Sequence, residues 1–235
     1  MLVGIVNYGI VRLTASGNLD TSFGNDGLVA VDGLIEFAVA PNGRIVATSS
    51  GNTVIRLTAN GTIDTTFGSG GSITVPTSLG PVAVQPDGKI LVGGSMEVSG
   101  DGYEGTSTYD LAVTRLNVNG SVDTTFGTDG TSTADYNKFD PGDYLNNEAQ
   151  TLSLTVLSNG NILAGAEAQQ QGAPGGPSAL AAAEFLPNGK IDTSFADGGE
   201  IGPYFLTADF FAFTLASVIV QADGSHLGRK RQGDG

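Results

Sequence analysis

The side chains best suited to binding a metal ion lie in two acidic insertions. The first insertion contains Asp101, Glu104 and Asp110, and the second contains four more acidic residues: Asp135, Asp140, Asp143 and Glu148. Calcium takes about six to eight oxygen ligands from carboxylates, carbonyls and water. Neither insertion has the residue spacing of an EF-hand loop. Two interpretations follow: solvated loops that bind no metal, or a calcium site. The calcium ligands would come from these candidates: Asp101, Glu104, Asp140 and Asp143.

The side chains available for other catalytic chemistry are few. His226 is the only histidine and the chain has no cysteine, so three-histidine and Cys/His metal sites are excluded. The G-x-S-x-G motif of many serine hydrolases is absent. A pair of carboxylates could still hydrolyse a glycoside, since the separation of the two groups is set by the fold. We therefore expect a protein without enzymatic activity, and a carbohydrate-active enzyme is the alternative.

An aspartate recurs in a motif that the chain repeats. Its copies occupy four segments: residues 12–27, 56–71, 115–130 and 184–199. The aspartate precedes Thr-Thr-Phe or Thr-Ser-Phe in every copy, as Asp20, Asp64, Asp123 and Asp192. These carboxylates could form a ring at one face of the molecule. Catalytic groups are rarely repeated along a chain, however, so the repetition favours a structural role. In that role the carboxylate and the neighbouring hydroxyl cap the backbone of a turn.

The elements that position these aspartates are β-hairpins. Three copies of the motif contain Asn-Gly, which predicts a type I′ turn. Beyond the turn, apolar and polar residues alternate up to the phenylalanine, and this predicts a half-buried strand. A second hairpin pattern, with Asn-Gly or Asp-Gly at its centre, occupies four further segments: 37–49, 82–95, 154–166 and 218–228. Two hairpins give a unit of four antiparallel strands, and the phenylalanines recur at intervals of 44 to 69 residues. Such spacing is typical of β-propeller blades.

These two patterns together resemble a known family. V-x-P-D/N-G-K-I-L-V-x-G paired with R-L-N-x-x-G-x-x-D-T-T/S-F-G-x-x-G is similar to the delta-60 repeat, a bacterial β-propeller repeat without an assigned activity. The resemblance covers nearly the whole chain, in four copies. It implies an all-β propeller scaffold of four-stranded antiparallel blades, about four blade-equivalents, in a single domain of residues 1–235. The chain begins and ends within a blade pattern, so we expect that the ring could be incomplete.

Composition narrows the possible partners. The formal net charge of −14 disfavours binding to nucleic acids and to anionic membranes. The longest apolar stretch, residues 210–220, is too short for the ~20 residues that cross a bilayer as a helix. The first residues of this chain lack the basic start and long apolar segment of a signal peptide. The family resemblance nevertheless implies an extracellular or cell-surface location.

Taken together, the residues and the resemblance predict a non-catalytic β-propeller scaffold or binding module of a larger exported bacterial protein. Its partner would be a protein or a glycan, bound through loops that differ between blades. Unpaired blade edges would also allow self-association. The alternatives are a carbohydrate-active enzyme and a calcium-stabilised adhesive module, both of which would use the acidic loops.

Overall fold

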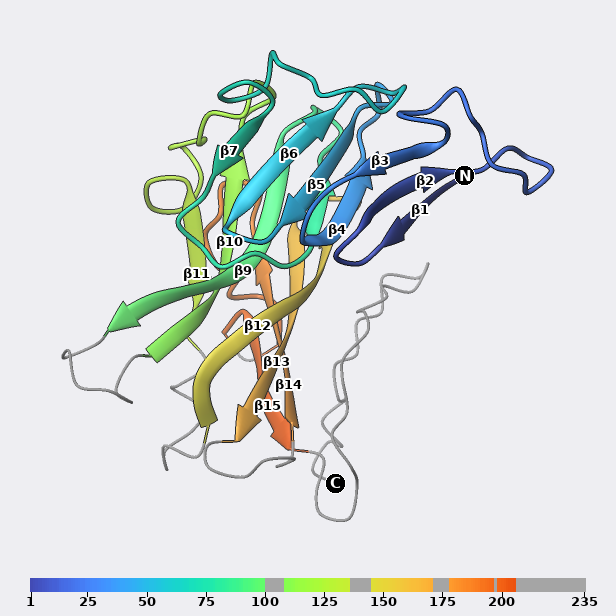
Figure 1. Ribbon diagram of the computed structural model, residues 1–235. Coiled ribbons are helices and arrows are strands. Elements are labelled where there is room, and N and C mark those ends of the chain that lie inside the picture. The colour runs from blue at the N-terminus through green and yellow to red at the C-terminus, as the bar shows by residue number, and fades with distance from the viewer. Residues whose placement is uncertain (100–107, 136–144, 171–177, 197, 206–235) are drawn as a thin grey trace.

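The structure is a computed structural model that describes residues 1–99, 108–135, 145–170, 178–196 and 198–205 (Figure 1). Its described residues form fifteen strands and no helix, which confirms the all-β prediction. Hence none of them forms an apolar helix able to cross a membrane. The strands make four separate antiparallel sheets, each with its strands in chain order. In Figure 1 these sheets follow one another around an open arc.

We name the sheets blades 1 to 4. Blade 1 contains three described strands: β1 (Leu2–Ile5), β2 (Gly9–Arg12) and β3 (Leu28–Ala30). Blade 2 contains β4 (Leu34–Val39), β5 (Ile45–Ser49), β6 (Thr53–Leu57) and β7 (Ser72–Thr74). Blade 3 contains β8 (Val82–Val84), β9 (Ile90–Ser99), β10 (Thr108–Leu116) and β11 (Thr131–Ala134). Blade 4 contains β12 (Leu145–Val156), β13 (Ile162–Gln170), β14 (Ser178–Phe185) and β15 (Glu200–Phe205).

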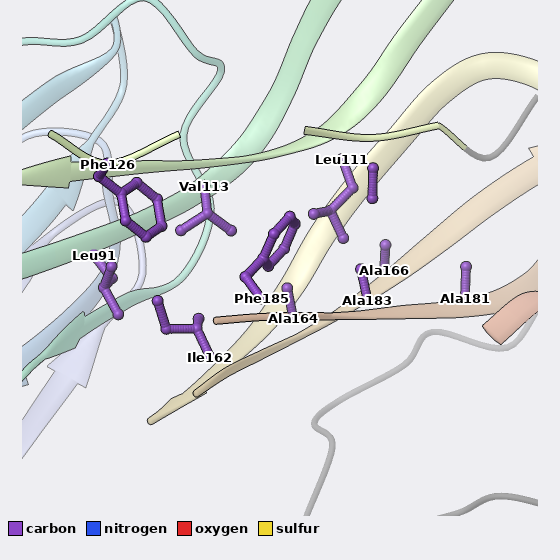
Figure 2. Packing of buried hydrophobic residues seen from close by; sticks show 11 residues of the cluster. Leu91, Leu111, Val113, Phe126, Ile162, Ala164, Ala166, Ala181, Ala183 and Phe185 are labelled. Carbon is purple, nitrogen blue, oxygen red and sulfur yellow. The ribbon is translucent and has the colours of Figure 1, made fainter. Parts of the chain in front are cut away.

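The apolar core lies between neighbouring blades. One cluster joins blades 1 and 2, a second joins blades 2 and 3, and a third joins blades 3 and 4. In the third, Figure 2 shows the rings of Phe126 and Phe185 among leucine, valine, isoleucine and alanine side chains of both blades. Strand β5 is buried along its whole length, since blades cover both of its faces. Each blade is therefore stabilised by its neighbours, as expected of a repeat architecture.

The second hairpin pattern is confirmed in three of its four copies. Strands β4 and β5 pair over 37–49, β8 and β9 over 82–95, and β12 and β13 over 154–166. The fourth copy, residues 218–228, lies outside the described residues. Within the part of the chain that the structure describes, β1 pairs only with β2, so β1 is the edge strand of the blade 1 sheet as described.

The turn type predicted for the repeated motif is wrong. A type I′ turn needs a positive φ at both central residues. Here Gly61 has a φ of 86°, whereas Asn60 is not among the residues with positive φ. The amide of Gly61 donates to Thr58 O at 3.0 Å, and the amide of Thr58 donates to Thr62 O at 2.8 Å. This pattern fits a type I turn followed by a left-handed glycine.

The strand predicted between this turn and the phenylalanine is also wrong. Ile63 forms only an isolated bridge with Leu57, and the chain then turns again. The turn forms because the Asp64 carboxylate accepts the amide proton of Thr66, two residues later, at 3.2 Å. The amide of Gly71 then donates to Phe67 O at 2.8 Å. The fourth strand of blade 2 starts only after this glycine, as β7.

Candidate functional site

The predicted calcium ligands are not tested by the structure. Asp101, Glu104, Asp140 and Asp143 all lie outside the described residues, so the calcium site remains a prediction. Of their acidic neighbours, Asp110 is buried, and burial together with the charge of Asp135 raises its pKa to about 6. Among the residues that are described, no group of three or more His, Cys, Asp or Glu side chains could hold a metal ion.

The repeated aspartate has the predicted structural role. In blade 2, Asp64 Oδ1 accepts the Thr66 hydroxyl at 2.6 Å and the Thr66 amide at 3.2 Å. Its Oδ2 accepts Arg44 Nε at 2.7 Å and Arg56 Nε at 2.9 Å. The Thr66 hydroxyl, aided by the Thr66 amide and both arginines, lowers the pKa of Asp64 to about 2. The carboxylate therefore stays ionised and capped, because these partners favour its charged form.

An arginine completes this cluster, a role that is absent from the expectations above. The guanidinium groups of Arg12, Arg56 and Arg115 lie over the rings of Phe23, Phe67 and Phe126, with Cζ at 4.8, 4.6 and 4.5 Å from the ring centroids. We call each set of three side chains an Arg–Asp–Phe cluster. The arginine stands eight residues before the aspartate in these three copies. That fixed spacing is the sequence signal that could have indicated the pair.

Each Arg–Asp–Phe cluster also binds the next blade. Arg12 Nη1 donates to Ala59 O of blade 2 at 2.9 Å, and Arg115 Nη1 donates to Pro187 O of blade 4 at 2.6 Å. Arg56 Nη1 donates to Val118 O of blade 3 in the same way. All three carbonyls belong to the turn of the following copy of the motif. The cluster is therefore a contact between blades as well as a cap within one.

The glycine of that following turn packs on the preceding phenylalanine. A methyl group on Gly120 would lie 2.8 Å from the ring of Phe67 and 2.8 Å from the amide nitrogen of Gly68. The Gly68 amide donates to Asn119 O at 2.8 Å. Gly61 and Gly189 lie in the same way against blades 1 and 3. Absence of a side chain is required at these positions because two backbones approach closely.

Blade 4 contains a different set of side chains at the same positions. Glu184 replaces the arginine of the cluster, and Asn161 stands where blades 2 and 3 have Arg44 and Lys89. Asn161 Nδ2 donates to Glu184 Oε1 at 2.7 Å and to Asp192 Oδ2 at 2.8 Å. The Ser194 hydroxyl donates to Asp192 Oδ1 at 2.6 Å. The capped aspartate is therefore retained, but a second carboxylate has taken the place of the cation.

These residues line a cavity of about 430 Å³, which we call the blade 4 pocket. Its lining contains eight residues: Asn159, Asn161, Glu184, Asp192, Ser194, Phe195, Ala196 and Ile201. Glu184 is 4% exposed. Hydrogen bonds from Ser194, and then from Asn161, lower the pKa of Asp192. The pocket thus places an ionised carboxylate and a buried glutamate beside an aromatic ring.

The chain was compared with known proteins. A family model, described as a domain of unknown function (DUF5122) beta-propeller, matches residues 3–23, 40–67, 85–126 and 157–195, which is more than half of the chain. The chain belongs to the DUF5122 β-propeller family. The matched segments include the aspartate of every copy and, in blades 1 to 3, the arginine as well. For this DUF5122 β-propeller, the expected propeller fold is confirmed, whereas the description of the family assigns no activity. No curated protein shows a significant match to the chain.

Proposed function

We propose that this DUF5122 β-propeller is a non-catalytic scaffold and binding module of a larger exported bacterial protein, with a protein as its ligand. The observation that carries the proposal is the use of the repeated polar side chains. In blades 1 to 3, the aspartate and the arginine are engaged with each other and with the backbone of the same or the next blade. Groups engaged in this way hold the fold together and are not available as acids, bases or nucleophiles.

The surfaces of the two end blades support a binding role. Among the described residues, β1 is the edge strand of blade 1, and apolar side chains on it and beside it are exposed: Met1, Val3, Ile5, Val6 and Tyr8. A free strand edge with apolar side chains favours pairing with another chain. Self-association of the DUF5122 β-propeller through this edge is part of the proposal. Blade 4 offers the blade 4 pocket, which differs chemically from the equivalent positions of the other blades.

The location outside the cell rests on the resemblance of the repeats and on the net charge of −14, which keeps an exposed module soluble. Fractionation of bacteria that produce the whole protein, followed by protease treatment of intact cells, tests this part. The module should be found in the medium or be cleaved on the cell surface. Recovery in the protease-protected cytoplasmic fraction would contradict export.

The absence of catalysis is tested by incubating the purified chain with a panel of chromogenic glycosides and polysaccharides. We expect no turnover above that of buffer. Turnover that disappears in Glu184→Gln and Asp192→Asn, but persists in Asp87→Asn, would overturn the non-catalytic role. Asp87 is the matched control because it lies in an exposed turn, and the corresponding residues of blades 2 and 4 are asparagines, Asn42 and Asn159.

A further inference from the structure

We propose that Asn42 and Asn159 are sites of spontaneous deamidation, at which the folded chain loses ammonia and gains negative charge. The chain contains five Asn-Gly steps: Asn42-Gly43, Asn60-Gly61, Asn119-Gly120, Asn159-Gly160 and Asn188-Gly189. An asparagine that precedes glycine meets the least steric hindrance in this reaction, because glycine has no side chain beside the attacking nitrogen. The contacts between blades decide which of the five steps react in the folded protein.

The reaction uses only groups of the turn and water. The glycine amide nitrogen forms a bond to the side-chain Cγ of the asparagine, the bond between Cγ and Nδ2 breaks, and the amide proton leaves with Nδ2 as ammonia. Water then opens the cyclic imide and leaves aspartate or isoaspartate. To react, the glycine nitrogen must give up its hydrogen bond and turn toward Cγ. Because the peptide group is planar, the backbone carbonyl of the asparagine must rotate with that nitrogen.

Both ends of this peptide group are fixed in the repeated motif. In blade 3, the amide of Gly120 donates to Asn117 O at 2.9 Å, while Asn119 O accepts the amide of Gly68 in blade 2 at 2.8 Å. Gly120 is buried, and a Cβ on it would lie 2.8 Å from the ring of Phe67. The carbonyls of two further copies accept the same bond between blades: Asn60 from Gly24 at 2.8 Å and Asn188 from Gly127 at 2.9 Å. Cyclisation at these three asparagines would therefore break a contact between blades.

In the second hairpin pattern, the contacts hold the nitrogen end of the peptide group. The amide of Gly43 donates to Ala40 O at 2.8 Å, and the amide of Gly160 makes the same bond within its own turn. Both glycines are half-buried. Among the described residues, no group of another blade donates to the backbone carbonyl of Asn42 or Asn159. These two peptide groups can therefore rotate as soon as the turn bond opens.

Blade 3 shows that the aspartate product fits this turn. Asp87 stands where blades 2 and 4 have Asn42 and Asn159. Asp87 Oδ1 accepts the amide of Lys89 at 3.0 Å, and Asn42 Oδ1 accepts the amide of Arg44 at 3.1 Å. The turn thus accommodates a carboxylate in the same hydrogen bond, which is stronger when the acceptor is charged. Conversion of Asn42 or Asn159 to aspartate should leave the blade folded.

Mass spectrometry of the full chain, incubated in the folded state at mildly alkaline pH and then digested, measures deamidation at each of the five steps. The same incubation in guanidinium chloride gives the rate of each step in the unfolded chain, so that the ratio of the two rates corrects for neighbouring residues. We expect this ratio to be about three- to tenfold higher at Asn42 and Asn159 than at the other three asparagines, the factor that one additional hydrogen bond provides. Asn42→Asp supplies the reference peptide that identifies the aspartate product.

Two matched variants test whether contacts between blades are the cause. Arg56 donates to the backbone carbonyl that precedes Asn119, and Arg115 donates to the one that precedes Asn188. Arg56→Met should therefore accelerate deamidation at Asn119 and leave Asn188 unchanged. Arg115→Met should accelerate it at Asn188 and leave Asn119 unchanged. Circular dichroism establishes that each variant is folded.

Three results would overturn the proposal. The first is an equal ratio of rates at all five steps, or a higher ratio at Asn119 than at Asn42. The second is an unchanged rate at Asn119 in Arg56→Met. The third is an equal acceleration of Asn119 and Asn188 in either arginine variant, because general loosening of the fold would then set the rates.

Discussion

Replacement of a turn glycine by alanine should be far more destabilising where the glycine packs against the preceding blade than in blade 1. Gly120 and Gly17 occupy the same position of the repeated motif and have φ angles of 90° and 84°. Alanine at either site therefore encounters the same left-handed backbone. The surroundings differ, because a Cβ on Gly120 would contact blade 2, whereas no atom of the described residues lies within 4 Å of a Cβ on Gly17.

The magnitude follows from this difference. A left-handed alanine costs about 1–2 kcal/mol, and this part is common to both variants. Gly120→Ala adds a contact at 2.8 Å with a backbone nitrogen and with the ring of Phe67. Neither neighbour is the end of a flexible side chain, so the overpacking should cost about 1–3 kcal/mol more. We expect Gly17→Ala to lose about 1–2 kcal/mol and Gly120→Ala about 2–5 kcal/mol of the free energy of unfolding.

Urea denaturation followed by far-UV circular dichroism measures both losses, and the urea dependence of wild type and variants should be the same. Equal losses in Gly17→Ala and Gly120→Ala would refute the reasoning. In that case the contacts of these turns with the preceding blade would not contribute to stability, and the repetition of the polar residues would need another explanation.

Three further predictions concern the same positions. Phe67→Ala should lose about 3–5 kcal/mol of the free energy of unfolding in urea denaturation, because removal of a buried ring leaves a cavity. Ile63→Ala, at a side chain that is 50% exposed, should lose less than about 1 kcal/mol. Similar losses in the two variants would show that Phe67 is not a core residue. Asp64 has a pKa of about 2, below its unfolded value, so its contribution to stability is present above about pH 4 and is lost as the pH falls towards 2; Asp64→Asn should flatten the acid limb of a pH–stability curve, and an unchanged limb would contradict the ion pairs. Ionisation of Asp110 should have the opposite effect on stability, since its pKa is raised to about 6 and stability is lost as the pH rises from about 4 through 6. Asp110→Asn should therefore melt at a higher temperature than wild type at pH 7. A lower melting temperature would show that the ionised carboxylate is needed.

The blades could be predicted from the sequence because the strands repeat with a clear hydrophobic alternation. Apolar residues such as Val82 and Val84 recur on one side of each hairpin. The alanine-rich segment of β14 could be assigned as a strand because it aligns with residues 111–114 of β10, the corresponding strand of blade 3. The segment from Ile63 to Phe67 was misread as a strand. It has the same alternation, but the Asp64 side chain binds the backbone locally and bends it, a competition that periodicity does not reveal.

The blade 4 pocket could not be predicted from the sequence either, and the reason is different. Glu184 in place of arginine is visible in the sequence, yet its meaning depends on what the arginine does in the other blades. That role requires the distance between Arg115 and the ring of Phe126, and the carbonyl of Pro187 that belongs to the next blade. The first contact lies within one copy of the motif and the second joins two copies, and the residue spacing alone predicts neither.

The central claim is that the Arg–Asp–Phe clusters stabilise the contacts between blades, and that blade 4 contains Glu184 and Asn161 where blade 3 has Arg115 and Lys89. The most direct measurement is the thermal denaturation of a double variant, Glu184→Arg with Asn161→Lys, which copies the Arg115 and Lys89 of blade 3 into blade 4. The restored ion pairs should raise the melting temperature by about 2–4 °C, the shift expected for about 1 kcal/mol in a chain of this size. A melting temperature that is unchanged or lower than that of the wild type would contradict the claim.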